Sequence, residues 1–278
     1  MIIKNSLLLR ILRFFSVLKK DGFSWTIVRI FLVILKQPNE IQRAKNKVLN
    51  KIILEHGHKV AYGTFKGMKL SKNTYWSKND IITHILGVYE KHVLKKIIEF
   101  SKKGNYPFID IGAADGYFAI GMAFSETFKK IYAFEIDEEG RRSLNRNIEN
   151  NLCKDKVVVD IEANFETLKE IVDKNKSAVI LIDIEGSEFD LLDDNLLQLL
   201  SNCYIVCELH PTLSANGFEK QNMLINNAKA FFDVSIIQRE SYSPNKFSEL
   251  NEFTDEERLI AFGEGRENNM NWLILEPK

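Results

Sequence analysis

The sequence predicts an α/β fold built around a mostly parallel sheet. Short apolar runs, most of them ending in an acidic residue, alternate along the chain with stretches of helical periodicity. Such runs are typical of strands that are buried on both faces of a parallel sheet. A chain of 278 residues is long enough for one such domain with appendages, and its formal net charge of zero gives no indication of nucleic-acid binding.

The first core strand and the turn after it carry the most informative motif. Residues 108–118 read Phe-Ile-Asp-Ile-Gly-Ala-Ala-Asp-Gly-Tyr-Phe, which predicts a strand, a glycine turn and a helix N-terminus. Turns of this kind hold nucleotide-like cofactors because the backbone comes close to the ligand, although a turn that needs glycine only for packing is the alternative. The spacing of Asp110, Gly112 and Gly116 lacks the middle glycine of the dinucleotide fingerprint. A carboxylate at Asp110 suits the α-ammonium of S-adenosylmethionine better than it suits a pyrophosphate.

The segments before this strand differ from the core in charge. Residues 1–59 contain twelve basic and three acidic residues, with apolar stretches at 7–18 and 23–35 that are shorter than the ~20 residues needed to cross a bilayer. We expect a basic amphipathic helical extension that contacts an anionic membrane surface, or a helical hairpin packed on the domain or on a second subunit of a homo-oligomer. Residues 60–100 predict a hairpin and then a helix from about 79 to 100. Tyr89 and Glu90 on it either reach the cofactor or serve in packing and capping, which is the more common role at a helix start. Residues 101–278 form the core domain.

The second and third predicted strands add two sides of a cofactor site. The second, residues 130–137, contains Glu135, which lies 23 residues after Gly112, where an acid commonly accepts hydrogen bonds from a ribose diol. An exposed strand-end Glu is the alternative. Asp137 is predicted to cap the next helix. The third strand, residues 156–162, is followed by Ala163 and Asn164, which we expect to border an adenine.

The fourth and fifth predicted strands end in ionisable residues. Residues 178–185 place Asp183 and Glu185 on one side, and residues 203–211 do the same for Glu208 and His210. Such side chains are costly to bury without a task, although pairing with nearby loops is the alternative for Glu185 and Glu208. We expect His210, and next Asp183, to act as a general base, with a neutral strand-end histidine bonded to a carbonyl as the alternative for His210. Alternatively, Asp183, Glu185 and Glu208 hold Mg²⁺.

The rest of the chain completes the alternation. Helices are predicted at 187–200 and 217–232, a strand at 234–238, a capping box at 254–257 and a last strand at 270–276. The three cysteines are odd in number, and Cys203 and Cys207 would lie too far apart along one strand for a disulfide. No secretory signal is evident, so we expect a reducing, cytoplasmic location, with peripheral membrane contact through the N-terminus.

Together these motifs resemble the FkbM-type family of S-adenosylmethionine-dependent methyltransferases over about residues 100–276. The resemblance rests on residues 108–113 with 116–118, on Ala133-Phe134-Glu135, and on Ile182-Asp183-Ile184-Glu185-Gly186-Ser187-Glu188, which matches the family signature D-x-E-G-x-E. It implies a Rossmann-like class I methyltransferase fold, with a seven-stranded, mostly parallel sheet whose last strand is reversed. The family commonly has Asn where Ala114 stands, and Asp115 would then supply that polar contact.

The resemblance also implies an activity, namely O-methylation of a hydroxyl, often on a sugar in a glycan or a glycosylated metabolite. Two other functions stay open from the residues alone: an NAD-dependent oxidoreductase on the same kind of sheet, and a catalytically silent binding module. The residues that we expect to contact S-adenosylmethionine are Asp110, Gly112, Ala113, Asp115, Gly116, Tyr117, Glu135, Ile136, Ala163, Asn164 and Asp183.

Overall fold

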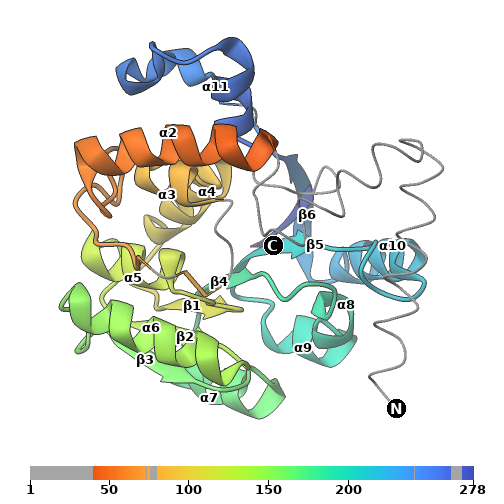
Figure 1. The fold of residues 1–278 in the computed structure, drawn as a ribbon. Coiled ribbons are helices and arrows are strands. Elements are labelled where there is room, and N and C mark those ends of the chain that lie inside the picture. The colour runs from red at the N-terminus through yellow and green to blue at the C-terminus, as the bar shows by residue number, and fades with distance from the viewer. Residues whose placement is uncertain (1–39, 73, 76–79, 241, 264–270) are drawn as a thin grey trace, which may run out of the picture.

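The computed structural model describes residues 40–72, 74–75, 80–240, 242–263 and 271–278. The predicted amphipathic extension at residues 1–39 therefore lies outside the described residues. One sheet forms the centre of the molecule, with the strand order β3-β2-β1-β4-β5-β7-β6 (Figure 1). The strands are β1 (Phe108–Ile111), β2 (Ile131–Phe134), β3 (Val157–Asp160), β4 (Val179–Ile182), β5 (Tyr204–Leu209), β6 (Phe232–Gln238) and β7 (Asn271–Pro277).

The direction of the strands confirms the predicted fold. β1 pairs in parallel with β2 and β4, β2 pairs in parallel with β3, and β4 pairs in parallel with β5. The last strand, β7, inserts between β5 and β6 and is antiparallel to both. This is the seven-stranded, Rossmann-like arrangement with a reversed last strand. Because the strand order changes direction at β1, the carboxyl ends of β1 and β4 mark the place where such sheets bind ligands.

Helices cover both faces of the sheet. One apolar cluster joins the strands to α4, α5 and α6, and the other joins them to α7, α8, α9 and α10. A connection that crosses from a strand to its parallel neighbour needs a helix of this kind, which is why strands and helices alternate. The bounds are α4 (Lys91–Ser101), α5 (Tyr117–Phe124), α6 (Glu138–Asn150), α7 (Phe165–Asn175), α8 (Glu188–Leu191), α9 (Asp194–Leu199) and α10 (Gly217–Ala228).

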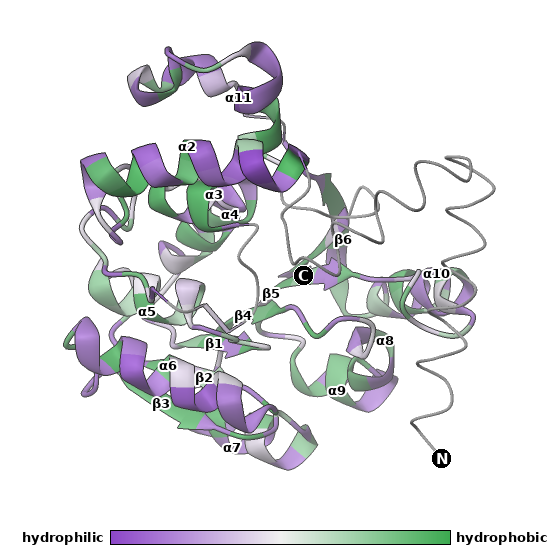
Figure 2. Ribbon diagram, viewed as in Figure 1, coloured by the Kyte–Doolittle hydropathy of each residue, from purple (hydrophilic) through white to green (hydrophobic). Residues whose placement is uncertain are grey.

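A third apolar cluster lies beside the sheet. It joins α2 (Glu40–His56), α3 (Ile81–Ile85) and α11 (Asp255–Ala261), with α2 packed against both of the others (Figure 1). Two short 3₁₀ turns, Pro244–Lys246 and Ser248–Leu250, precede α11. Figure 2 shows hydrophobic and hydrophilic residues alternating along α2, as expected for a helix with one buried side. This cluster fixes the segment that leads into the sheet.

The structure corrects two helix predictions and one hairpin. The helix expected at about 79–100 is two helices, because Gly87 and Glu90 adopt left-handed backbone conformations between α3 and α4. The helix expected at 187–200 is also two, since Asp193 caps a new helix, α9, with its side chain. The hairpin expected after residue 60 is reduced to one antiparallel bridge between Lys59 and Lys69.

Two predicted helix caps are confirmed. Asp137 accepts hydrogen bonds from the backbone N–H groups of Glu139 and Gly140 at the start of α6. Thr254 and Glu257 form the predicted capping box of α11. All three cysteines are buried free thiols. Within the described ranges, every helix is too short or too polar to cross a bilayer.

Candidate functional site

The glycine turn after β1 is shaped by packing against its neighbours. Gly112 and Gly116 have φ angles of +89° and +86°, and Ala114 between them has a φ of +46°. A Cβ atom on Gly112 would meet the Asp183 carbonyl oxygen at 1.9 Å, and a Cβ on Gly116 would meet the Leu144 side chain at 2.4 Å. Both glycines therefore serve the packing of the turn, the alternative that the sequence left open.

Asp110 lies at the carboxyl end of β1, where its side chain is nearly out of contact with solvent. Its carboxylate accepts a hydrogen bond of 2.9 Å from the Ala119 N–H in the first turn of α5. Burial raises the pKa of Asp110 to about 7; the Ala119 hydrogen bond opposes this shift, and the charges of Asp183 and Glu135 add to it. The site thus holds an acid whose charged form is costly until a cation comes close.

Glu135, just after β2, reaches across to the glycine turn. Its carboxylate accepts hydrogen bonds of 2.8 Å from the N–H groups of Ala114 and Asp137. Asp115 in the same turn accepts hydrogen bonds from the Tyr75 N–H and from the Ser143 hydroxyl. The two bonds to the Ala114 and Asp137 N–H groups fix the carboxylate of Glu135 beside the turn, at the place where the sequence predicts a ribose.

A cavity of about 1090 Å³ opens at this edge of the sheet. Every residue predicted to contact the cofactor lines it except Gly116, whose role is the packing described above. Asp183 and Glu185 also line it, whereas His210 and Glu208 lie behind its wall, each 1% exposed. The predicted cofactor residues thus share one cavity, while the predicted base is shielded from it.

The wall beyond Glu135 is apolar. Ile136, Ile161 and Phe165 line the cavity and are 73%, 54% and 39% exposed, unusually high fractions for such side chains. Ala163 lies among them, and Asn164 uses its side chain to cap α7 through the Thr167 N–H. A flat apolar ring could pack against this part of the cavity wall, which the side chains of Ile136, Ile161 and Phe165 form.

The cavity is also lined by the rings of His84, Tyr89 and Tyr117, of which His84 was not predicted from the sequence. The His84 ring stacks on Tyr117 with the ring centroids 4.2 Å apart, and Tyr89 meets His84 edge-on at 4.2 Å. Burial lowers the pKa of His84 to about 3, so that the ring is neutral. A lone His within an apolar helix is easily taken for a core residue, and only its position on the cavity reveals it. Glu90, expected near the cofactor, is buried beside His92 and does not line the cavity.

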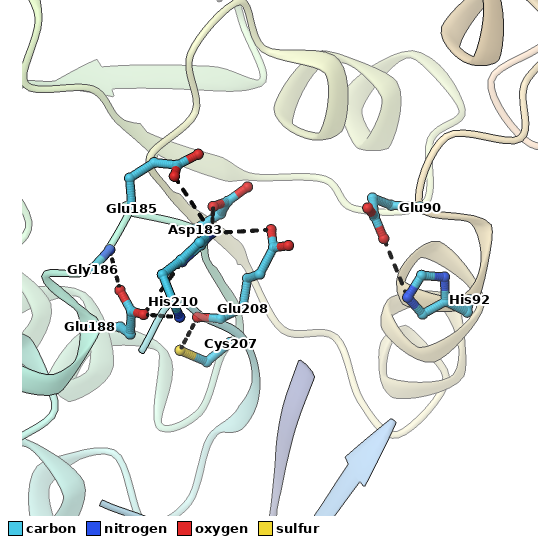
Figure 3. A network of polar contacts seen from close by, with 9 residues as sticks. All are labelled: Glu90, His92, Asp183, Glu185, Gly186, Glu188, Cys207, Glu208 and His210. Atoms are coloured by element: carbon cyan, nitrogen blue, oxygen red, sulfur yellow. Dashed lines mark hydrogen bonds and ion pairs between the residues drawn. The ribbon is translucent and has the colours of Figure 1, made fainter. Parts of the chain in front are cut away.

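Four carboxylates surround the His210 imidazole (Figure 3). Its Nε2 atom lies 3.7 Å from an oxygen of Asp183, 3.7 Å from one of Glu185 and 3.8 Å from one of Glu208. Its Nδ1 atom lies 3.3 Å from Glu188, which also accepts hydrogen bonds from the N–H groups of Gly186 and His210. Glu185, with a φ of +52°, and Gly186, with a φ of +103°, form the tight turn that brings these side chains together.

The carboxylates and the imidazole shift one another's pKa. Burial alone would lower the pKa of His210, but Glu188, Asp183 and Glu185 hold it above its ordinary value. Burial alone would raise the pKa of Glu188, but hydrogen bonding to His210 holds it below its ordinary value. Asp183, Glu185 and His210 can each direct one ligand atom to a common point, whereas the predicted metal set had Glu208 in place of His210.

Comparisons with known proteins give weak likenesses only. No protein-family model matches the chain, and no curated protein matches its sequence. An O-methyltransferase from Bacillus cereus in complex with SAH is 13% identical over 91% of this chain and 99% of its own, with a TM-score of 0.47. M. jannaschii TYW2 in complex with AdoMet is 15% identical over 75% and 80%, with a TM-score of 0.45. The B. subtilis M1A22 tRNA methyltransferase TrmK is 12% identical over 66% and 65%, with a TM-score of 0.44. These likenesses add nothing to what the strand order itself shows.

Proposed function

We propose that this protein is an S-adenosylmethionine-dependent O-methyltransferase of the FkbM type, acting on a hydroxyl of a sugar in a glycan or glycosylated metabolite. The observation that carries the proposal is the placement of Asp110 and Glu135. Both carboxylates line one cavity at the point where the strand order changes direction, on either side of a glycine turn. One suits a cation and the other suits a diol, and S-adenosylmethionine carries both.

The lining of the cavity supports this orientation of the cofactor. The α-ammonium would lie near Asp110, the ribose hydroxyls at Glu135, and the adenine between Ile136 and Phe165 beside Ala163. A dinucleotide fits the same lining poorly. Its pyrophosphate would lie against the glycine turn beside the carboxylate of Asp110, and like charges at close range are unfavourable.

The acidic end of the cavity is where the acceptor would bind. In methyl transfer the bond from sulfur to the methyl carbon breaks, with its electron pair remaining on sulfur, and the acceptor oxygen forms the new bond to carbon. The hydroxyl proton passes to Asp183, which lines the cavity, and His210 behind it acts as a positioning residue. Holding the two reactants in line can supply about 7–11 kcal/mol of the barrier reduction.

The choice of a sugar hydroxyl as acceptor rests on two features of the wall. Carboxylates such as Asp183 and Glu185 accept hydrogen bonds from neighbouring hydroxyls, and the aromatic residues Tyr89 and Tyr117 line the same cavity as an apolar surface for the C–H side of a sugar. The basic N-terminal segment is proposed to bring the enzyme to an anionic membrane surface. If a chain lacking residues 1–36 binds anionic vesicles as well as the full chain does, that part of the proposal fails.

The first experiment is calorimetric titration of the full chain with S-adenosylhomocysteine and, separately, with NADH. Binding of the first ligand alone is expected, and both Asp110→Asn and Glu135→Gln should weaken it at least about tenfold, which is about 1.4 kcal/mol each. Glu138→Gln is the matched control, since Glu138 is exposed, pairs with Arg142 and does not line the cavity.

The outcomes separate the rival functions. Binding of NADH alone would overturn the proposal in favour of an oxidoreductase. Binding of S-adenosylhomocysteine, followed by transfer of labelled methyl groups to a glycan or nucleotide sugar, would support it. Cofactor binding with no transfer to any acceptor in such a screen would indicate a silent binding module.

A further inference from the structure

We propose that Asp183, Glu185 and His210 bind one divalent transition-metal cation, with Mn²⁺ as the ion. The binding itself is independent of the proposed methyl transfer. It rests on the distances around the His210 Nε2 atom, on the way Glu188 orients the imidazole, and on the nitrogen and oxygen donors that converge there.

The distances are wrong for hydrogen bonds and close to those between ligands of one metal ion. The Nε2 atom lies 3.7 Å from Asp183 Oδ1 and 3.7 Å from Glu185 Oε2. A charge-assisted hydrogen bond would bring such atoms to about 2.7–2.9 Å. Two ligand atoms that each lie about 2.1 Å from a metal are about 3.0 Å apart at right angles and about 3.6 Å apart at trigonal angles. The donor atoms of the three residues all lie within 4.8 Å of one another, and the Glu185 side chain is 41% exposed.

The imidazole is oriented as in known metal sites. His210 is 1% exposed, and its Nδ1 atom faces Glu188 at 3.3 Å, so that Nε2 points toward Asp183 and Glu185 (Figure 3). Metal-binding histidines almost always turn their second ring nitrogen to a carboxylate or carbonyl, which fixes the tautomer and the ring plane. Glu188 is itself fixed by the N–H groups of Gly186 and His210, so the required support is already built.

The donors around His210 suit a cation. Asp183, Glu185, Glu188 and Glu208 all place an oxygen within 4 Å of the imidazole, and Glu188 and Glu208 are fully buried. Carboxylate oxygens beside an imidazole nitrogen form a mixed donor set that divalent first-row metals take in proteins.

The donor set favours Mn²⁺ over the Mg²⁺ expected from the sequence. Mg²⁺ prefers oxygen ligands throughout, whereas an imidazole nitrogen suits first-row transition metals. Because Asp183 and Glu185 line the cavity, the remaining coordination positions of the ion face it. If the proposed function holds, an acceptor hydroxyl bound there becomes more acidic and gives up its proton more easily.

The chain offers a matched control in a second cluster, formed by Glu55, His56 and Glu249. There the His56 Nε2 atom is 2.7 Å from a Glu249 oxygen, which also accepts a hydrogen bond from the Tyr62 hydroxyl. The imidazole nitrogen is thus already hydrogen-bonded, so this cluster is not expected to bind an ion.

The test is titration of the metal-stripped full chain with MnCl₂, with free Mn²⁺ followed by its electron paramagnetic resonance signal. We expect one Mn²⁺ per chain. His210→Ala and Glu185→Gln should each weaken binding at least about tenfold. His56→Ala should bind as the unchanged chain does, and excess Mg²⁺ should compete poorly. Because Glu185 is 41% exposed on its side chain, Glu185→Gln keeps the test valid if His210→Ala fails to fold.

Absence of Mn²⁺ binding, or binding that survives both His210→Ala and Glu185→Gln, would overturn the proposal. Equal loss in His56→Ala would also overturn it, because the ion would then not be assigned to this cluster. Titration of the same samples with S-adenosylhomocysteine separates the two proposals. Cofactor binding without Mn²⁺ binding refutes only the metal site, and Mn²⁺ binding without cofactor binding refutes only the proposed methyltransferase.

Discussion

Gly112 and Asp183 pack so closely that a Cβ atom on Gly112 would lie 1.9 Å from the Asp183 carbonyl oxygen. The contact joins the turn after β1 to the end of β4, and Asp183 donates its own N–H to the Ile111 carbonyl 2.9 Å away. The side of the cavity proposed for the cofactor and the side proposed for the acceptor are thus held together by backbone atoms. A side chain at position 112 would force the two strand ends apart.

Gly112→Ala should therefore be severely destabilising. The new methyl group meets backbone and cannot be relieved by rotation of a side chain, and a φ of +89° is unfavourable for alanine. We expect the free energy of unfolding in urea to fall by more than about 4 kcal/mol, which is exceptional for a single substitution.

Gly57→Ala is the control for the backbone conformation alone. Gly57 has a φ of +65°, but a Cβ there would meet no atom within 4 Å. Its cost should be only about 1–2 kcal/mol, that of a left-handed alanine. Equal losses in the two variants would show that the contact with Asp183 does not matter.

The pH dependence of cofactor binding should report on Asp110. Burial raises the pKa of Asp110 to about 7. Binding of a cation requires its carboxylate form, so below about pH 7 the Asp110 carboxyl group must lose its proton when the ligand binds. The dissociation constant for S-adenosylhomocysteine should rise about tenfold from about pH 8 to about pH 6, since each pH unit well below the pKa costs about 1.4 kcal/mol.

Asp110→Asn, which cannot titrate, should bind more weakly and with a flatter pH profile. Calorimetry in two buffers of different ionisation enthalpy gives the number of protons released. If the unchanged chain releases no proton at about pH 6.5, Asp110 does not pair with the ammonium group.

The sequence predicts well which residues lie at the cavity edge of the sheet, because the end of each apolar run can be read from the run itself. Asp110, Glu135 and Asp183 each end an apolar run, and parallel strands carry such ends to one edge whatever the details of packing.

The break between α3 and α4 could not be predicted in this way. Gly87 is required there because a Cβ would meet the Tyr62 carbonyl oxygen at 2.0 Å, a contact between segments 25 residues apart.

The same distinction explains what could not be predicted around His210 and His84. The alternation of strand residues correctly places Glu208 and His210 on one side, but it gives no measure of depth. His210 lies behind Asp183 because Glu188, from the next helix, accepts its backbone N–H and faces its ring. His84 was missed because its neighbours Ile81, Ile82 and Ile85 are all core residues, and only the open cavity beside Tyr117 distinguishes it from them.

His84 should make the fold sensitive to acid. Burial lowers its pKa to about 3, whereas the unfolded chain has the ordinary value of 6.5. Between these values the unfolded state binds a proton that the folded state does not, so stability falls as the pH drops below 6.5 and is unaffected above it.

His84→Phe keeps a ring against Tyr117 and removes the titration. From about pH 7.5 to about pH 5.5, the unchanged chain should lose about 1.4 kcal/mol of unfolding free energy that the variant does not lose. Tyr89→Phe, in the same aromatic group, should keep the original dependence. Urea denaturation at the two pH values measures this, and parallel curves for the unchanged chain and His84→Phe would refute the assignment.

Glu188 should stabilise the turn that carries Glu185 and Gly186. It is fully buried, and its two oxygens accept hydrogen bonds from the N–H groups of Gly186 at 2.8 Å and His210 at 2.5 Å. In Glu188→Gln one oxygen becomes an NH₂ group, so one buried backbone N–H loses its acceptor and faces another donor. That should cost about 1–3 kcal/mol of unfolding free energy. Hydrogen exchange at the Gly186 and His210 amides should accelerate accordingly, while Glu138→Gln changes neither quantity. Unchanged exchange at both amides in Glu188→Gln would mean that the turn is held by other contacts.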